Sequence, residues 1–147
     1  MIITDESLLR VKCDNVDMAE VPDLIADLEH ELSESDKIGR PGIGLACPQI
    51  GIHKRVAIVR IPKSMYNDSV SINLVNAKII KKYNLITINN EGCLSFPDLL
   101  IRSKRYNEIV VQNEVYPNKF IVTGLAAICV QHELDHLDGI LLPDVAT

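Results

Sequence analysis

Near its C-terminal end the chain reads Gln131-His132-Glu133-Leu134-Asp135-His136-Leu137-Asp138-Gly139. Together with the apolar residues before it, this stretch predicts a helix from about residue 125 to residue 138, which Gly139 ends. Two histidines four residues apart share one helix face and lie about 6 Å apart, so both imidazoles can bind one metal ion. Glu133 follows the first histidine and can act as a base toward a water on that ion. Because this face continues the apolar face of the helix, we expect a buried metal site.

The chain before this helix predicts one further helix and a series of short strands. Leu24, Leu28 and Leu32 recur on one face of residues 21–36, which predicts an N-terminal amphipathic helix that Pro22 opens. Strands are predicted over residues 55–61, 74–82, 85–89, 101–106, 109–115 and 119–122, with a loop over 62–68 and turns at 83–84 and 116–118. Strands between two helices, without alternating βαβ order, indicate an α+β fold. We expect antiparallel or mixed sheets around the central metal-binding helix, in a single domain of residues 1–147.

The composition is that of a slightly acidic globular domain. Of 147 residues, 47% are hydrophobic and 24% are charged, and the formal net charge is −5. This balance, without a cluster of Lys and Arg, argues against direct binding of nucleic acid. No run of about 18 apolar residues predicts a membrane span, and no signal peptide is visible, so we expect a cytoplasmic protein that does not contact a membrane. The four cysteines are accordingly expected to be reduced.

A catalytic metal on this helix needs a third protein ligand, and the sequence restricts the choice. Asp138 and Asp144 are the only acids after His136, and neither is well placed to join the two histidines. Upstream, Cys93 stands in the segment Glu91-Gly92-Cys93-Leu94-Ser95, where the glycine allows close approach of the backbone. Two histidines and one cysteine leave a fourth position for water, which is typical of a catalytic site rather than a structural one.

A third segment completes the pattern: residues 42–49 read Gly-Ile-Gly-Leu-Ala-Cys-Pro-Gln. Together with residues 91–95 and 131–137, in this order, it resembles the three motifs of the peptide deformylase family. The resemblance implies that Cys93, His132 and His136 bind one metal ion. It implies that Glu133 is the general base and acid, and that the oxyanion is stabilised by the metal, the Gln49 side chain and the Leu94 backbone N–H.

The same resemblance implies a substrate, a cofactor and partners. The substrate would be the N-terminal formylmethionine of nascent polypeptides, from which formate is released. Its side chain would occupy an apolar pocket built from Ile43, Leu125, Ile128 and Cys129, while backbone at Ile43, Gly44 and Gly92 pairs with the peptide. The implied cofactor is one Fe²⁺ ion per chain, for which Zn²⁺ or Ni²⁺ can substitute. Implied partners are nascent chains and, transiently, the ribosome.

Three departures from the family pattern accompany the resemblance. Cys47 replaces the usual second alanine of the first motif, and Phe96 stands where a smaller aliphatic residue is common. The sequence ends at Thr147, without the C-terminal helix of longer bacterial members, and in this it resembles bacteriophage-encoded forms. Two alternatives stay open at this stage: a small metallopeptidase, which shares His-Glu-x-x-His, and a non-catalytic zinc module, in which Cys129 would be the fourth ligand.

Overall fold

The computed structural model describes residues 1–65 and 68–147. Three α-helices are described: α1 (Glu6–Leu9), α2 (Val21–Lys37) and α3 (Gly124–Leu137). The strands are β1 (Gly44–Ala46), β2 (Val56–Ile61), β3 (Val70–Val75), β4 (Lys78–Cys93), β5 (Phe96–Gln112) and β6 (Lys119–Thr123). Single 3-10 turns lie at Met18–Glu20, Cys47–Ile50, Lys63–Met65 and Leu142–Val145. The α+β prediction is confirmed.

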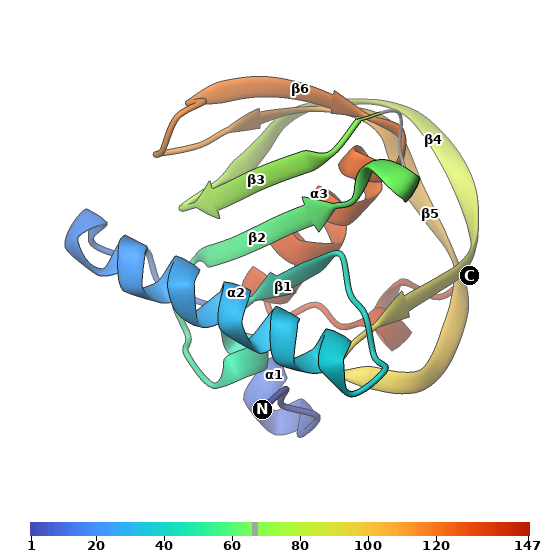
Figure 1. The fold of residues 1–147 in the computed structure, drawn as a ribbon. Helices are drawn as coiled ribbons and strands as arrows, with labels where there is room; N and C mark the ends of the chain where they lie inside the picture. The colour runs from blue at the N-terminus through green and yellow to red at the C-terminus, as the bar shows by residue number, and fades with distance from the viewer. Residues whose placement is uncertain (66–67) are drawn as a thin grey trace.

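The strands form two antiparallel sheets, one of β1, β2 and β3 and the other of β4, β5 and β6. Helix α3 lies between them, and α2 covers the opposite face of the first sheet (Figure 1). Successive residues of β2 alternate between these helices: Val56 and Ile58 pack toward α2, whereas Ala57 and Val59 pack toward α3. Since both faces of β2 are buried, residues 56–59 form a continuous apolar run rather than an alternating pattern.

Helix α2 matches the sequence prediction closely. Leu24, Leu28 and Leu32 are buried against the first sheet, with Pro22 in the first turn. The helix stops before Gly39, whose φ of 81° is a left-handed conformation that favours glycine.

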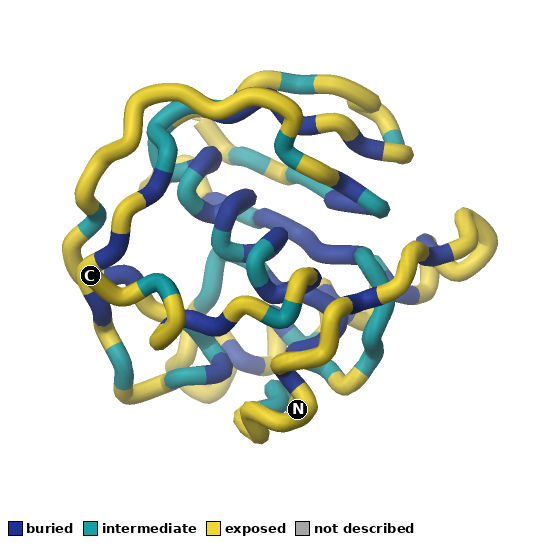
Figure 2. The backbone as a smooth tube through the Cα atoms, turned by 180° about the vertical axis from the view of Figure 1, so that it is seen from behind, coloured by how far each residue is buried: buried dark blue, intermediate teal, exposed yellow. Residues whose placement is uncertain are grey.

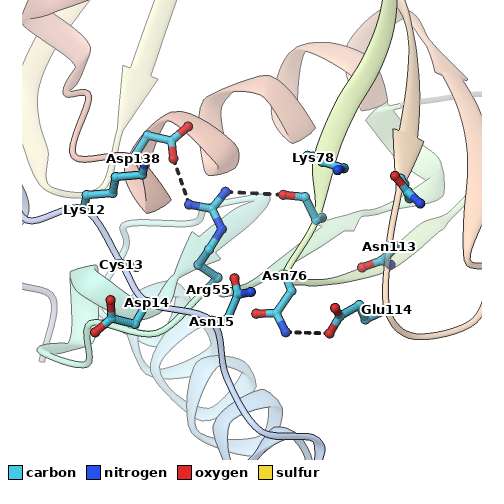
Figure 3. Close-up of a pocket in the computed structure, with 12 residues that line it drawn as sticks. Lys12, Cys13, Asp14, Asn15, Arg55, Asn76, Lys78, Asn113, Glu114 and Asp138 are labelled. Atoms are coloured by element: carbon cyan, nitrogen blue, oxygen red, sulfur yellow. Dashed lines mark hydrogen bonds and ion pairs between the residues drawn. The ribbon is translucent and has the colours of Figure 1, made fainter.

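Helix α3 is buried along most of its length and is fixed at its C-terminus. Gly139 has a φ of 74°, and a Cβ atom there would lie 2.6 Å from the carbonyl oxygen of Arg10. The guanidinium of Arg55 donates to the Leu137 carbonyl at 3.2 Å and to the Asp138 carboxylate at 2.8 Å (Figure 3). The backbone N–H of Cys13 also donates to the Leu137 carbonyl, at 2.8 Å, so this carbonyl, which the last turn of a helix leaves without an intrahelical partner, has two donors.

The second sheet differs from the prediction of short strands. Residues 83–84 are not a turn, because β4 runs without interruption through them and Asn84 takes up its φ of 59° inside the strand. The predicted strand 74–82 is instead interrupted at residues 76–77, which connect β3 of the first sheet to β4 of the second. The two strands predicted at 101–106 and 109–115 are one strand, β5, which pairs with β4 from Lys78–Gln112 to Cys93–Phe96.

Exposure explains why the length of β4 was missed. Most of β4 faces solvent, as the yellow outer strand in Figure 2 shows, so its sequence lacks a regular apolar period.

The predicted loop at 62–68 includes the 3-10 turn Lys63–Met65, and its residues 66–67 lie outside the described residues. Within the described ranges, no helix is both long and apolar enough to cross a bilayer.

Candidate metal centre and catalytic site

Three side chains from two elements converge on one point. Cys93 ends β4, while His132 and His136 lie one turn apart on α3, and their ligand atoms are all within 4.8 Å of one another. The Cys93 Sγ atom is 3.2 Å from His136 Nε2, which is 3.3 Å from His132 Nε2. Ligands about 2.0–2.3 Å from a tetrahedral ion are roughly 3.3–3.8 Å apart, so the two contacts approach the spacing that such an ion requires. The donor set of one sulfur and two imidazole nitrogens suits a divalent transition metal.

The ring of His132 is oriented by a buried carboxylate. Its Nδ1 atom lies 2.8 Å from Glu91 Oε2, which leaves Nε2 directed at the ligand group. Glu91 also accepts a bond of 2.7 Å from Ser103 and two bonds from Arg105. Burial alone would favour the neutral acid, but hydrogen bonds from His132 and Arg105 outweigh it and hold the pKa of Glu91 well below its usual range.

Glu133 lies beside the ligand group and is 4% exposed. Burial raises the pKa of Glu133 to about 7, against the opposing charges of His132 and Arg105. A carboxyl group that titrates near neutrality can both take up and release a proton. Among the described residues, Glu133 Oε1 and His136 Nδ1 are the buried side-chain polar atoms without a hydrogen-bond partner. An unpaired carboxylate oxygen at the wall of a cleft is suited to receive a proton from water or substrate.

Gln49 is held next to Cys93 by its own hydrogen bonds. Its Oε1 atom accepts from the backbone N–H of Ala46 at 3.0 Å, and its Nε2 atom donates to Ser95 Oγ at 3.1 Å. The same Nε2 atom lies 3.6 Å from Cys93 Sγ. The amide is therefore fixed with its donor end toward the candidate metal site. Leu94 follows Cys93 directly, at the tight connection between β4 and β5.

These residues line a cleft of about 760 Å³. Every site residue that the sequence predicted borders this cleft except His136, whose side chain is buried. The apolar wall contains Ile43, Leu125, Ile128 and Cys129, as expected. Ile88, Met65 and Asp98 also line the cleft and were not predicted, because Ile88 is apolar within a strand and the other two lie in segments without a motif. The structure thus brings the predicted residues together in one place.

Two further cysteines have environments that the sequence left open. Cys129 borders the cleft but does not belong to the group of metal-ligating atoms found among the described residues. Cys47 is fully buried between α2 and the first sheet. Burial raises the pKa of both thiols to about 12.

A second cleft, of about 650 Å³, lies at the other end of α3 (Figure 3). Its rim is formed by exposed polar side chains such as Lys12, Asp14 and Lys78. None of the predicted site residues lines it, and the candidate chemistry is confined to the first cleft.

The fold and the first cleft define a class: a metal-dependent hydrolase in which one helix supplies two histidines and a base, and a strand supplies a cysteine. Comparison with known proteins supports this class. The model of the family "Polypeptide deformylase" matches residues 1–147. The chain belongs to the polypeptide deformylase family, as its three motifs predicted.

Individual members of the family are similar to the chain over most of its length. Peptide deformylase 2 of Prochlorococcus marinus is 35% identical over 133 residues, which cover 88% of this chain and 65% of that protein. The crystal structure of a probable peptide deformylase from Synechococcus phage S-SSM7 is 36% identical, has a TM-score of 0.84, and the match covers 99% of this chain and 98% of that one. A peptide deformylase from Acinetobacter baumannii, solved with Met-Ala-Ser bound, is 28% identical with a TM-score of 0.80, over 99% of this chain and 96% of that one.

Proposed function

We propose that this chain, as one catalytic domain of residues 1–147, removes the formyl group from the N-terminal formylmethionine of nascent polypeptides. The products are formate and a peptide with a free amino terminus. The observation that carries this proposal is the grouping of Cys93, His132 and His136 beside the buried carboxylate of Glu133, at the wall of an apolar cleft. Membership of the deformylase family supports it.

The group Cys93, His132 and His136 would hold one divalent ion, which we propose to be Fe²⁺, with Zn²⁺ or Ni²⁺ able to take its place. When bound, the ion supplies Lewis acidity, which polarises the formyl carbonyl and acidifies a water molecule. Glu133 takes the proton of the attacking water and then delivers it to the amide nitrogen that leaves. Gln49 Nε2 and the Leu94 backbone N–H donate to the carbonyl oxygen as negative charge develops on it.

The apolar wall of the cleft is proposed to select methionine. Ile43, Leu125, Ile128 and Cys129 provide a narrow surface without a charged group, suited to a flexible thioether side chain. Backbone groups of Ile43, Gly44 and Gly92 would pair with the peptide in extended conformation. The Met-Ala-Ser peptide in the Acinetobacter baumannii enzyme has the sequence of such a product. We propose the cytoplasm as the place of action and nascent chains as the partners, with any ribosome contact being transient and made without the C-terminal helix of longer bacterial members.

Formate release from formyl-Met-Ala-Ser by protein purified without oxygen tests this function. We expect release that a chelator abolishes and that added Fe²⁺ restores. Glu133→Ala should keep the metal and lose activity by about 10²–10⁴-fold, the usual contribution of general acid–base catalysis. Glu34→Ala, on the exposed side of α2, serves as the matched control and should be fully active. Hydrolysis of an internal peptide bond without formate release would instead identify a peptidase.

A further inference from the structure

Arg105 connects two carboxylates beside the candidate metal site. It lies on β5, and its side chain is only 6% exposed. Its Nε atom donates to Glu91 Oε1 at 2.9 Å and its Nη2 atom to Glu91 Oε2 at 2.6 Å. Its Nη1 atom donates to Asp135 Oδ2 at 2.5 Å. One guanidinium thus binds one carboxylate through two bonds and the other through a third.

The two carboxylates belong to the two elements that carry the metal-ligating candidates. Glu91 is on β4, two residues before Cys93, and Asp135 is on α3, between His132 and His136. β4 pairs with β5, and α3 packs on β5 from the interior side, so a β5 side chain is placed to reach both. Arg105 therefore spans the interval between the strand that carries the thiol and the helix that carries the imidazoles.

A neighbouring contact shows which part of this geometry depends on Arg105. The side chain of Gln131, on α3, bonds to both the N–H and the carbonyl of Tyr106, at 2.9 and 2.7 Å. This link fixes β5 against α3 without help from Arg105. Residue 105 adds the connection to Glu91, and Glu91 in turn contacts His132 Nδ1 at 2.8 Å.

We propose that Arg105 is a positioning residue that sets the spacing between Cys93 and the two histidines, so that the ligand group is formed before a metal binds. The planar guanidinium is suited to this role because its donors have fixed directions and engage both oxygens of Glu91 at once. A lysine would keep the charge but lose the fixed geometry. The inference rests on the proposed metal site and not on the proposed substrate.

The test compares two arginines that bind carboxylates at the same helix. Arg105→Lys changes the link near the ligands, and Arg55→Lys changes the link between Arg55 and Asp138 at the C-terminus of α3 (Figure 3). The probe is Co²⁺ added to metal-free protein, with affinity measured by competition with a chromogenic chelator. The visible absorption of bound Co²⁺ reports the coordination geometry, and thermal unfolding of the metal-free protein reports stability.

We expect Arg105→Lys to weaken Co²⁺ binding by about 10–100-fold, as loss of outer contacts to ligands does in other metal sites, and to alter the Co²⁺ spectrum. Arg55→Lys should lower the melting temperature and leave affinity and spectrum unchanged. Unchanged affinity in Arg105→Lys would overturn the proposal, because the residue would then only stabilise the fold. Equal weakening in both variants would also overturn it, since any loosening of α3 would suffice.

A second variant keeps the test decisive if Arg105→Lys does not fold. Asp135→Asn removes the charge on the helix side and leaves the bonds to Glu91, and we expect about a tenfold loss of Co²⁺ affinity. Wild-type affinity in Asp135→Asn would contradict the proposal. Formate release is scored separately: wild-type protein that binds Co²⁺ tightly without releasing formate would count against the proposed function and not against this role of Arg105.

Discussion

The backbone of Gly44 lies directly against the carboxylate of Glu133, so that a Cβ atom at position 44 would overlap with Oε2. Gly44 is the first residue of β1 and pairs with Val59 of β2. Glycine is required at this position because any side chain would collide with the Glu133 carboxylate. The backbone angles of Gly44 themselves are not unusual. Strand β1 thereby forms the wall against which the base is held.

Replacement of this glycine should therefore displace the base. We expect Gly44→Ala to lower kcat/KM for formyl-Met-Ala-Ser by about 100-fold, because a shift of about 1 Å in a catalytic group has an effect of this size. Metal content, measured by atomic absorption, should not change. Glu133→Asp shortens the side chain and removes the overlap, so adding Gly44→Ala in that background should cause little further loss. A full additional 100-fold loss in the double variant would show that Gly44 acts in another way.

The sequence predicted helices α2 and α3 and the grouping of the metal-ligating candidates because their signals are local, whereas it did not predict the single turn of α1. In α2 the recurrence of Leu24, Leu28 and Leu32, with Gly39 at the end, is sufficient to define the helix. In α3 the four-residue spacing of the histidines places both on one face. Cys93 was identified by the absence of a suitable acid after His136, and the structure brings its sulfur to the two imidazoles.

The second sheet and the outer contacts of the metal site depend on pairing between distant residues. Nothing near Tyr83 shows that its partner is Glu108 on another strand. Arg105, read alone, is a charged residue in a strand and would be expected to face solvent. It is buried because Glu91 and Asp135, fourteen and thirty residues away in the chain, supply its acceptors. Such a network becomes visible only when the fold has brought its members together.

The four cysteines should differ sharply in reactivity. Burial raises the pKa of Cys13 to about 11 and those of Cys47 and Cys129 to about 12. The thiolate is the reactive form, so these three should resist iodoacetamide at pH 7.5. We expect brief treatment of metal-free protein to label Cys93, which is partly exposed, and Zn²⁺ to protect it. Peptide mass spectrometry measures the sites. Labelling of Cys129 at the rate of Cys93 would contradict the environments described above.

The bond from Gln49 to Ser95 should matter for catalysis more than for stability. Ser95→Ala removes the acceptor that fixes Gln49 Nε2 at 3.1 Å. Loss of a complete oxyanion donor reduces kcat by about 10²–10³-fold, so we expect a mobile donor to reduce it by about tenfold, with KM little changed. Ser35→Ala is a matched control, because Ser35 is also buried and donates to the Arg40 carbonyl at 2.6 Å, away from the ligand group. Steady-state kinetics in which both variants behave alike would contradict a role for Ser95 in positioning Gln49.

The link between the two ends of the chain should depend on pH. Arg10 donates to both oxygens of Asp144, at 2.9 and 3.1 Å, and these bonds, with one from the Leu141 N–H, lower the pKa of Asp144 below its ordinary 3.8. A carboxyl group with a lowered pKa in the folded state stabilises the fold above its unfolded pKa, and this contribution is lost as the pH falls through the folded value. Because the pair is exposed, a double-mutant cycle of Arg10→Gln and Asp144→Asn should give a small but measurable coupling free energy at pH 7. Urea unfolding at pH 7 and near pH 2 measures it, and coupling that persists undiminished in acid would show that the carboxylate charge is not its source.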